Sequence, residues 1–496
     1  MLQFKWVNST YFLITFILLL GIFFRSYEAV ERFDFAHDGD LYSWIIKDIV
    51  INHHFRLIGQ ETSSEGIFIG PLFYYALIPF FALSSFDPVG GLVFVVVLGT
   101  LTIFSFYFIF KNLFNKAAGL IAAFLQAIMI TRVNHDRWLV PTITTNLWEV
   151  WFFYVIVKLT RGDFSVFFLL GILIGLMWHI NLSEAPLLIL IPIAILLSKK
   201  IPKLKDLKAG LIGLILPSVP LIIFEFKHNF IQTKSFLLSF ITDQGGGKGY
   251  DKLIHVLQQV SGNTNDLFFY PYRDFYGNSF IPFALLLLIP LLLTYLKIID
   301  KKITFILFFW LASMIGFFSF SSKIISEYYF SNIDMVFLAF FIILLTAVFN
   351  KVKFGKTIII LFLTVFLIRN GYFLISKSSY NLTGYFERKA AVEYIYQDAK
   401  QKGYPCVAIS YIASPGNNVG FRYLFYLHNL IVNHPPSEGP VYTIVIPYEL
   451  AKDSILARFG NIGLIPPETN ESLQEIQKSC GDKNSNLTDP LFGYVQ

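Results

Sequence analysis

The sequence predicts a polytopic α-helical membrane protein that ends in a small external α/β domain. Three observations support this fold class. The chain has 496 residues, of which 55% are hydrophobic and only 15% are charged, whereas soluble globular proteins carry roughly 25% charged residues. About eleven apolar stretches approach the ~20 residues that a bilayer-spanning helix needs. After residue 375 the sequence becomes polar and alternating. A soluble enzyme and a disordered chain are therefore excluded.

The predicted spans follow one another through the first 375 residues. The first span lacks a small-residue cleavage site before Arg25, so we interpret it as an uncleaved helix. A twelfth apolar stretch, 67–83, has Gly and Pro near both ends, which favours a short helix that dips into the outer leaflet. A complete extra span is the alternative. The predicted spans are 9–24, 88–110, 117–131, 141–157, 164–180, 183–198, 207–224, 279–296, 303–320, 331–349 and 357–375.

The basic residues predict the orientation, because Lys and Arg in short connectors mark the cytoplasmic side. If 67–83 does not cross, every basic connector falls inside. These connectors are 111–116, 158–161, 199–208, 297–302 and 351–356. The external segments are then 25–87, 132–140, 225–278, 321–330 and the tail from 376. We therefore expect a multi-pass protein of the cell membrane. Because its Lys and Arg are scattered among short loops, nucleic acid is not an expected partner.

Two domains follow from this orientation. Residues 1–375 form the predicted transmembrane domain, in which 25–87 is a long external loop with membrane-lying helices. Residues 376–496 form the predicted external domain. Its alternating runs from Cys406 and from Val441 are typical of strands, and residues 387–402 predict a helix before them. Cys406 and Cys480 can pair if the external side is oxidising, and the sequence leaves this open.

The first external loop contains Phe35-Ala-His-Asp38-Gly-Asp40, just after the first span. Two carboxylates two residues apart can both point at one ligand. Close carboxylates raise one another's pKa, or they bind a cation. The pattern therefore indicates a general base or a metal anchor at a membrane surface. The alternative is a solvated loop with ordinary acidic residues.

The second external loop carries His135-Asp136-Arg137 between two apolar spans. Ionisable groups held at membrane depth are costly and tend to be functional. A guanidinium such as that of Arg137 can bind a phosphate through two parallel hydrogen bonds. The alternative is an interfacial ion pair of Asp136 with Arg132 or Arg137.

Other polar residues stand at the external ends of later spans. They can contribute to the same site, or they can anchor the helices at the membrane interface within an aromatic belt. These residues are His179, Glu225, Lys227, His228, Lys323, Glu327, Tyr328 and Tyr329.

Taken in order, these residues resemble the GT-C-type integral-membrane glycosyltransferases, most closely the protein-O-mannosyltransferase and aminoarabinose-transferase group. The likeness covers about residues 1–375. It consists of an Asp just after the first span, Gly70-Pro71 before the second span, the His135-Asp136-Arg137 loop and Glu327-Tyr-Tyr-Phe before a late span. The common family pair is Asp-Glu, whereas this chain has Asp-Gly-Asp. Which of Asp38 and Asp40 matches the family carboxylate therefore stays open.

The resemblance implies a transferase that uses a polyprenyl-phosphate sugar as donor and an external hydroxyl as acceptor, with inversion. The acceptor is a glycan, a lipid or a protein. On this hypothesis Asp38 is the catalytic base and Asp40 supports it, Arg137 and Lys323 bind phosphate, and a divalent cation (Mg or Mn) is held by Asp38, Asp40 and Asp136 if one is used. The other predicted substrate-binding residues are Arg56, His135, Asp136, Lys227, Glu327 and Tyr328.

The alternative function is a lipid or sugar transporter or flippase of the cell envelope. A transporter needs a polar path through the bilayer, yet few ionisable residues lie at mid-span, and Glu149 is the main one. The clustering of charges on one side of the membrane favours the transferase.

Overall fold

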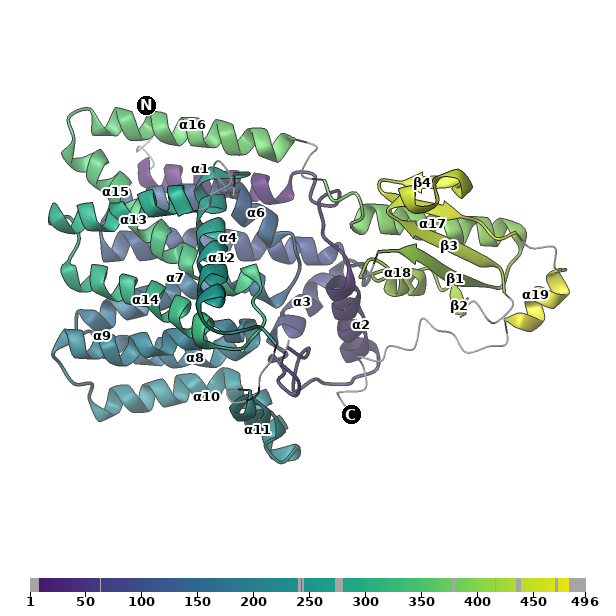
Figure 1. Ribbon diagram of the computed structural model, residues 1–496, viewed down its shortest axis with the longest axis horizontal. Helices are drawn as coiled ribbons and strands as arrows, with labels where there is room; N and C mark the ends of the chain where they lie inside the picture. Colours follow the sequence, from purple (N-terminus) through teal and green to yellow (C-terminus); the bar gives the residue numbers. More distant parts are fainter. Residues whose placement is uncertain are drawn as a thin grey trace, which may run out of the picture.

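The computed structural model describes residues 9–62, 64–239, 242, 245–272, 280–376, 380–414, 416–433, 439–468 and 472–480. A bundle of roughly parallel and antiparallel helices is joined to a mixed β-sheet, and two short helices lie between them (Figure 1). The polytopic helical fold class with a small C-terminal sheet is thereby confirmed.

Each predicted span corresponds to a helix or to a pair of helical segments. Among the described residues, five helices are long and apolar enough to cross a membrane alone: α4, α10, α14, α15 and α16. The bent pair α5 and α6 makes a sixth candidate, and further apolar helices are shorter. The bundle helices are α1 (Ser9–Ser26), α4 (Gly90–Leu113), α5 (Lys116–Ile128), α6 (Ile130–Asp136), α7 (Thr145–Thr160), α8 (Phe167–Ile180), α9 (Leu190–Ser198), α10 (Leu204–Lys227), α13 (Phe280–Tyr295), α14 (Lys301–Phe320), α15 (Ile333–Lys351) and α16 (Gly355–Ile375).

The segment expected as an external loop at 132–140 differs from that expectation. α5 and α6 meet at an angle of 58°, because Met129 between them has an extended backbone (φ −64°, ψ 107°). The helix then continues to Asp136, since Ile130 and Val133 are buried in the hydrophobic core. His135 and Asp136 therefore lie on a helix that contacts α1, α12 and α16.

Short helices occupy the bundle end nearest the sheet. α2 (His37–Ile51) and α3 (Leu72–Leu83) lie between the bundle and the sheet (Figure 1). The 12 residues of α3 span about 18 Å, well short of the ~30 Å hydrocarbon core of a bilayer. This length agrees with a helix that does not cross. Three more segments belong to this region or to its connectors: α11 (Ile231–Leu238), η3 (Leu182–Ile189) and η4 (Glu327–Phe330). α12 (Tyr250–Phe269) runs across the bundle helices and contacts α13, α14, α15 and η4 (Figure 1).

The C-terminal sheet has five strands in the order β2-β1-β3-β5-β4. β1 pairs in parallel with β2 and β3, whereas β5 pairs antiparallel with β3 and β4. The helix expected at 387–402 and the strands expected from Cys406 and Val441 are present. The elements are α17 (Tyr385–Lys402), β1 (Cys406–Ala413), α18 (Arg422–Leu427), β2 (Ile431–Asn433), β3 (Val441–Ile446), β4 (Ala457–Phe459), β5 (Ile462–Ile465) and α19 (Leu473–Ser479). Residues 481–496 lie outside the described part of the predicted external domain.

One disulfide and one hydrophobic cluster hold the sheet in place. Cys406 at the start of β1 and Cys480 after α19 form a disulfide, which decides the pairing that the sequence left open. One hydrophobic cluster then runs from the first loop into the sheet and includes Phe33, Phe35 and Tyr385. The sheet domain therefore contacts α2 through α18, and its hydrophobic core is continuous with that of α2 and α3.

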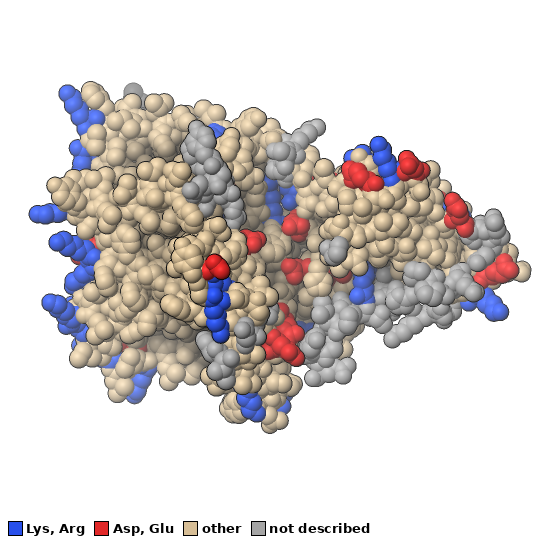
Figure 2. All heavy atoms as spheres, in the orientation of Figure 1, with Lys and Arg blue, Asp and Glu red and all other residues tan. Residues whose placement is uncertain are grey.

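Charged side chains are unevenly distributed over the molecule. Lys and Arg project from the end opposite the sheet, where the α9–α10 and α15–α16 connectors lie, whereas Asp and Glu gather in the hollow between the bundle and the sheet (Figures 1 and 2). We refer to these as the lysine end and the sheet end. This segregation is the arrangement that the sequence predicted from its basic connectors.

Candidate active site

A pocket of about 550 Å³ opens at the sheet end of the bundle. It brings together α2, the loop after α2, the segment after α6, η3, the end of α14 and η4. Its lining residues are Asp38, Gln60, Glu61, Thr62, Ser64, Ile67, Ile69, Trp138, Val140, Pro141, Thr142, Ile180, Asn181, Leu182, Ser183, Ala185, Pro186, Leu188, Phe236, Phe317, Phe318, Lys323, Tyr328 and Tyr329. We call this the polar pocket.

Asp38 enters the polar pocket from the first turn of α2 and is half-buried. Burial raises the pKa of its carboxyl above the ordinary value. The neighbouring His37 lowers that pKa, and Asp34 raises it further. One helical turn later, Tyr42 is fully buried, and burial and the nearby charge of Asp38 raise the pKa of its hydroxyl. Asp38 therefore has the environment of a carboxylate that can take up a proton.

Lys323 reaches the same pocket from the connector between α14 and η4. Burial lowers the pKa of its ammonium group. The connector is held by Lys252 of α12, whose Nζ donates to the carbonyl oxygens of Lys323 (2.5 Å) and Gly246 (2.7 Å). The pocket thus contains a carboxylate and a partly desolvated cation, and such a cation binds anions more strongly than an exposed lysine does.

Aromatic side chains form much of the remaining wall. Trp138 meets Tyr328 edge to face, with ring centroids 6.1 Å apart, and Phe318 stacks on Tyr329 at 5.6 Å. The sequence predicted Tyr328 but did not single out Trp138 or Glu61. Trp138 directly follows His135-Asp136-Arg137, so its position beside that motif was the available signal.

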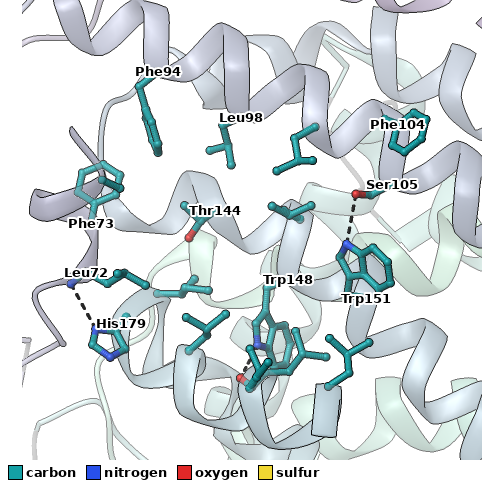
Figure 3. A pocket seen from close by; sticks show the side chains of 18 of the residues that line it. Leu72, Phe73, Phe94, Leu98, Phe104, Ser105, Thr144, Trp148, Trp151 and His179 are labelled. Atoms are coloured by element: carbon teal, nitrogen blue, oxygen red, sulfur yellow. Dashed lines mark hydrogen bonds between the residues drawn. The ribbon is translucent and has the colours of Figure 1, made fainter. Parts of the chain in front are cut away.

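A second pocket of about 520 Å³ is almost entirely apolar. It lies between α3, α4, α7 and α8, and its tryptophans use their N–H groups inside the protein: Trp148 donates to the carbonyl of Leu173 (2.7 Å) and Trp151 to the Ser105 hydroxyl (3.2 Å) (Figure 3). Ile180 lines both pockets. The two pockets therefore lie on either side of Ile180 at the end of α8.

His179 connects α8 to the Gly70-Pro71 segment. Its Nδ1 accepts the N–H of Leu72 (3.3 Å), and its Nε2 lies 2.7 Å from the carbonyl oxygen of Pro217. A Cβ on Gly70 would lie 2.0 Å from the His179 ring, so only glycine allows this approach. The histidine accordingly fixes the wall between the two pockets.

The structure places Asp40 away from the polar pocket. Successive helix residues are rotated by about 100°, so Asp38 and Asp40 point in directions about 200° apart. Asp40 is buried, and its Oδ1 accepts the N–H of Tyr423 in α18 (2.9 Å). The expectation that both carboxylates face one ligand is therefore wrong.

The His135-Asp136-Arg137 motif joins α6 to α1. Asp136 accepts a hydrogen bond from Nε of Arg25 (2.8 Å). The ion pair given as the alternative for this motif is therefore present, with Arg25 as the partner in place of Arg132 or Arg137. Arg137 is buried and donates to the carbonyl oxygens of Phe24 (2.9 Å) and Tyr27 (3.2 Å). His135 is partly buried and packs edge-on against Trp138. None of the three motif residues lines the polar pocket.

The remaining predicted residues also lie outside the lining. Arg56 is buried in an ion pair with Asp48 (2.6 Å). Lys227 at the end of α10 and Glu327 in η4 have exposed side chains, and the backbone carbonyl of Glu327 accepts a hydrogen bond from Asn263 (2.6 Å).

Three ionisable residues inside the bundle lie within ion-pair distance of one another. Arg132 contacts Glu149 (3.1 Å) and Asp334 (3.6 Å). Glu149, the mid-span acid noted in the sequence, is therefore part of a buried ion-pair network.

No group of three His, Cys, Asp or Glu that could hold a metal ion occurs in the described ranges. Asp38, Asp40 and Asp136, the predicted ligand set, are separated because Asp40 binds the sheet domain and Asp136 binds Arg25. We assign no metal to this set.

Comparisons with known proteins agree with this architecture. A family model described as "Dolichyl-phosphate-mannose-protein mannosyltransferase" matches residues 69–223, less than half of the chain. No curated protein matches the chain. The crystal structure of ArnT from Cupriavidus metallidurans bound to undecaprenyl phosphate has a TM-score of 0.52 at 13% identity, over 92% of this chain and 98% of that one.

The apo state of the same protein has a TM-score of 0.51 at 11% identity, over 96% of this chain and 99% of that one. At such identities the likeness concerns the fold, and it extends over nearly the whole length of both chains. The chain therefore has the fold of the GT-C-type membrane glycosyltransferases, and the resemblance predicted from its sequence is confirmed.

Proposed function

We propose that the protein is an inverting membrane glycosyltransferase that moves a sugar from a polyprenyl-phosphate donor to an acceptor hydroxyl. The family-model match and the fold support the coarser assignment as a membrane glycosyltransferase. The observation that carries the finer proposal is the polar pocket, which is lined by Asp38 and Lys323 and shares Ile180 with the apolar pocket.

Each group has one part in the proposed step. The acceptor oxygen forms a bond to the anomeric carbon while the bond from that carbon to the phosphate oxygen breaks. Asp38 takes the proton of the acceptor hydroxyl as general base. Lys323 stabilises the negative charge on the departing polyprenyl phosphate. The products are the glycosylated acceptor and the polyprenyl phosphate.

The two pockets suit the two parts of such a donor. The polar pocket offers hydrogen-bonding groups such as Gln60 and Asn181 beside aromatic rings that can cover the apolar face of a sugar. The apolar pocket, with residues such as Phe94 and Leu98 around it, suits part of a prenyl chain (Figure 3). On this proposal the sheet end faces the outside of the cell membrane, where the acceptor is a glycan, a lipid or a protein. The participation of a divalent cation stays a prediction. Sugar transfer measured with and without a chelator would test it.

The test is transfer from a panel of radiolabelled polyprenyl-phosphate hexoses and pentoses in membranes that contain the full chain. Asp38→Asn should reduce transfer by roughly 10²–10⁴-fold, the usual contribution of a general base. Glu65→Gln, which changes an exposed acid of the same loop, is the matched control and should retain wild-type transfer. Full transfer by the Asp38→Asn protein would refute the assignment.

A further inference from the structure

The helix that carries Asp38 is held from its other side by the sheet domain. Asp40 projects from that side of α2, is only 5% exposed, and accepts the backbone N–H of Tyr423 at 2.9 Å. Asp38 and Asp40 share one rigid helix, so the rotation that satisfies Asp40 also sets the direction in which Asp38 points.

The contact continues along the same face of α2. Trp44 and Lys47 follow Asp40 by four and seven residues, the spacing of one helical face. The Trp44 ring lies 5.4 Å from the Tyr423 ring and 5.0 Å from the Tyr426 ring, and Nζ of Lys47 lies 5.1 Å from the centroid of Tyr426. α18 thus covers the face of α2 that contains Asp40.

A buried cation of the sheet domain acts on Asp40 in this interface. Arg388 of α17 is only 2% exposed, experiences the charge of Asp40, and places its guanidinium 4.6 Å over the Phe421 ring. A buried carboxylate is stable only with hydrogen-bond donors and an opposite charge nearby. The hydrogen-bond donor, the N–H of Tyr423, and the opposite charge, the guanidinium of Arg388, both belong to the sheet domain.

The segments on either side of α2 and α3 are held by the same domain. Before α2, the N–H of Tyr385 donates to the carbonyl of Phe33 (3.1 Å). After α3, Lys389 forms an ion pair with Asp87 (2.6 Å). Gly420 has φ of +84°, and a Cβ there would lie 3.1 Å from the Cα of Ala36, so the two backbones approach closely just before α2.

We infer that Asp40 is a positioning residue through which the C-terminal sheet domain sets the rotation of α2, and with it the depth of Asp38 in the polar pocket. The role of Asp38 rests on the proposed function, whereas the contact between α2 and α18 does not. Loss of the Asp40 contact should let α2 move and should let water reach Asp38.

The first experiment measures hydrogen exchange by mass spectrometry on the full chain. Asp40→Asn should raise exchange roughly tenfold at residues 37–51 and 422–427, as expected for weakening a hydrogen bond to a charged group. The control is Asp398→Asn, the same substitution in the sheet domain, where Asp398 contacts Lys402 and Tyr442 but not α2. The control should leave exchange at 37–51 unchanged.

The second experiment measures the pH profile of sugar transfer. Because burial raises the pKa of Asp38, greater hydration should lower it again, so Asp40→Asn should move the acidic limb of the rate profile to lower pH. Asp398→Asn should not move that limb. Tyr426→Leu removes a ring beside Trp44 and keeps the charges. It should raise hydrogen exchange at 37–51 and move the acidic limb to lower pH, each by less than Asp40→Asn does.

The outcomes separate the two proposals. Unchanged exchange at 37–51 in both the Asp40→Asn and the Tyr426→Leu proteins would overturn the inference. Faster exchange with an unmoved pH profile would mean that Asp40 is merely structural and would also overturn the positioning role. Full sugar transfer by the Asp38→Asn protein would instead refute the proposed function. Hydrogen exchange would still decide whether Asp40 holds α2.

Discussion

At the scale of single residues, the surroundings of each carboxylate decide its role. Asp38 is half-buried in a pocket beside aromatic rings, Asp40 accepts a backbone N–H, and Asp136 pairs with Arg25. Of these three, Asp38 is the one that lines the polar pocket. Glu61, the other acid of the lining, accepts the backbone N–H of Gly66 (2.6 Å). Asp38 is therefore better suited to exchange a proton with a substrate.

Asp38→Asn should raise the thermal unfolding midpoint at neutral pH. The folded-state pKa of Asp38 lies above that of the unfolded chain, so the folded state binds this proton more tightly. The resulting stability is present below the ordinary pKa and is lost as pH rises through the raised pKa. The Asp38→Asn protein has no such titration, so its advantage in unfolding midpoint should grow as pH rises above the ordinary pKa of an aspartate, ~3.9. Thermal unfolding measured between pH 4 and pH 7 tests this, and equal midpoints at every pH would contradict it.

If the proposed function holds, Lys323→Gln should weaken binding of a polyprenyl phosphate by roughly 10–100-fold, because a hydrogen bond to a charged group contributes ~1.5–3 kcal/mol. The measurement is a thermal-shift titration of the purified full chain with undecaprenyl phosphate. Lys234→Gln, which changes an exposed lysine of α11, is the control and should keep wild-type affinity. Equal affinities of the Lys323→Gln and Lys234→Gln proteins would show that Lys323 does not bind the phosphate.

At the scale of elements, short and broken helices build the site. η3 and η4 supply much of the wall of the polar pocket, and α2 supplies Asp38. η3 contains Pro186, and the end of α8 is held against Gly70 by His179. Local departures from a straight helix therefore coincide with the residues that surround the pocket.

The disulfide joins elements 74 residues apart. Closing a loop of that length should stabilise the folded state by about 4 kcal/mol, because it lowers the entropy of the unfolded chain. The Cys406→Ser, Cys480→Ser double variant should therefore unfold its sheet domain at a clearly lower temperature. Thermal unfolding with and without reductant checks this. The wild type under reductant should resemble the variant, and reductant-insensitive unfolding of the wild type would contradict the prediction.

At the scale of the whole molecule, charge and packing give the protein two distinct ends. The lysine end carries the basic connectors, and the sheet end carries the acidic hollow (Figure 2). One hydrophobic cluster includes Leu77 of α3, Leu139 after α6 and Leu424 of α18. Since this core crosses from the bundle to the sheet, the two parts should move as one unit.

The orientation in the membrane can be tested with single introduced cysteines. An impermeant maleimide applied to intact cells should label Lys402→Cys in the sheet domain, because the sheet end faces outward on our proposal. Lys301→Cys at the start of α14 should be labelled only after lysis. The reverse pattern would place the active site on the cytoplasmic side and would contradict the proposed external acceptor.

Some of the site could be predicted from single residues. Lys323 and Tyr328 were selected as polar groups at the external end of a span, and both line the pocket. Arg137 was selected on the same grounds, yet it binds the carbonyls of Phe24 and Tyr27. An arginine that binds substrate and one that binds backbone look the same in sequence, since only the surrounding fold supplies its partners.

The sequence by itself determined the membrane architecture, because span length and the placement of Lys depend on local stretches of chain. It also determined the strands around Cys406 and Val441 through their alternating pattern. Only the tertiary structure decided that Asp38, and not Asp40, lines the pocket. That outcome depends on how α2 is rotated between the bundle and the sheet domain, and contacts between segments hundreds of residues apart set this rotation.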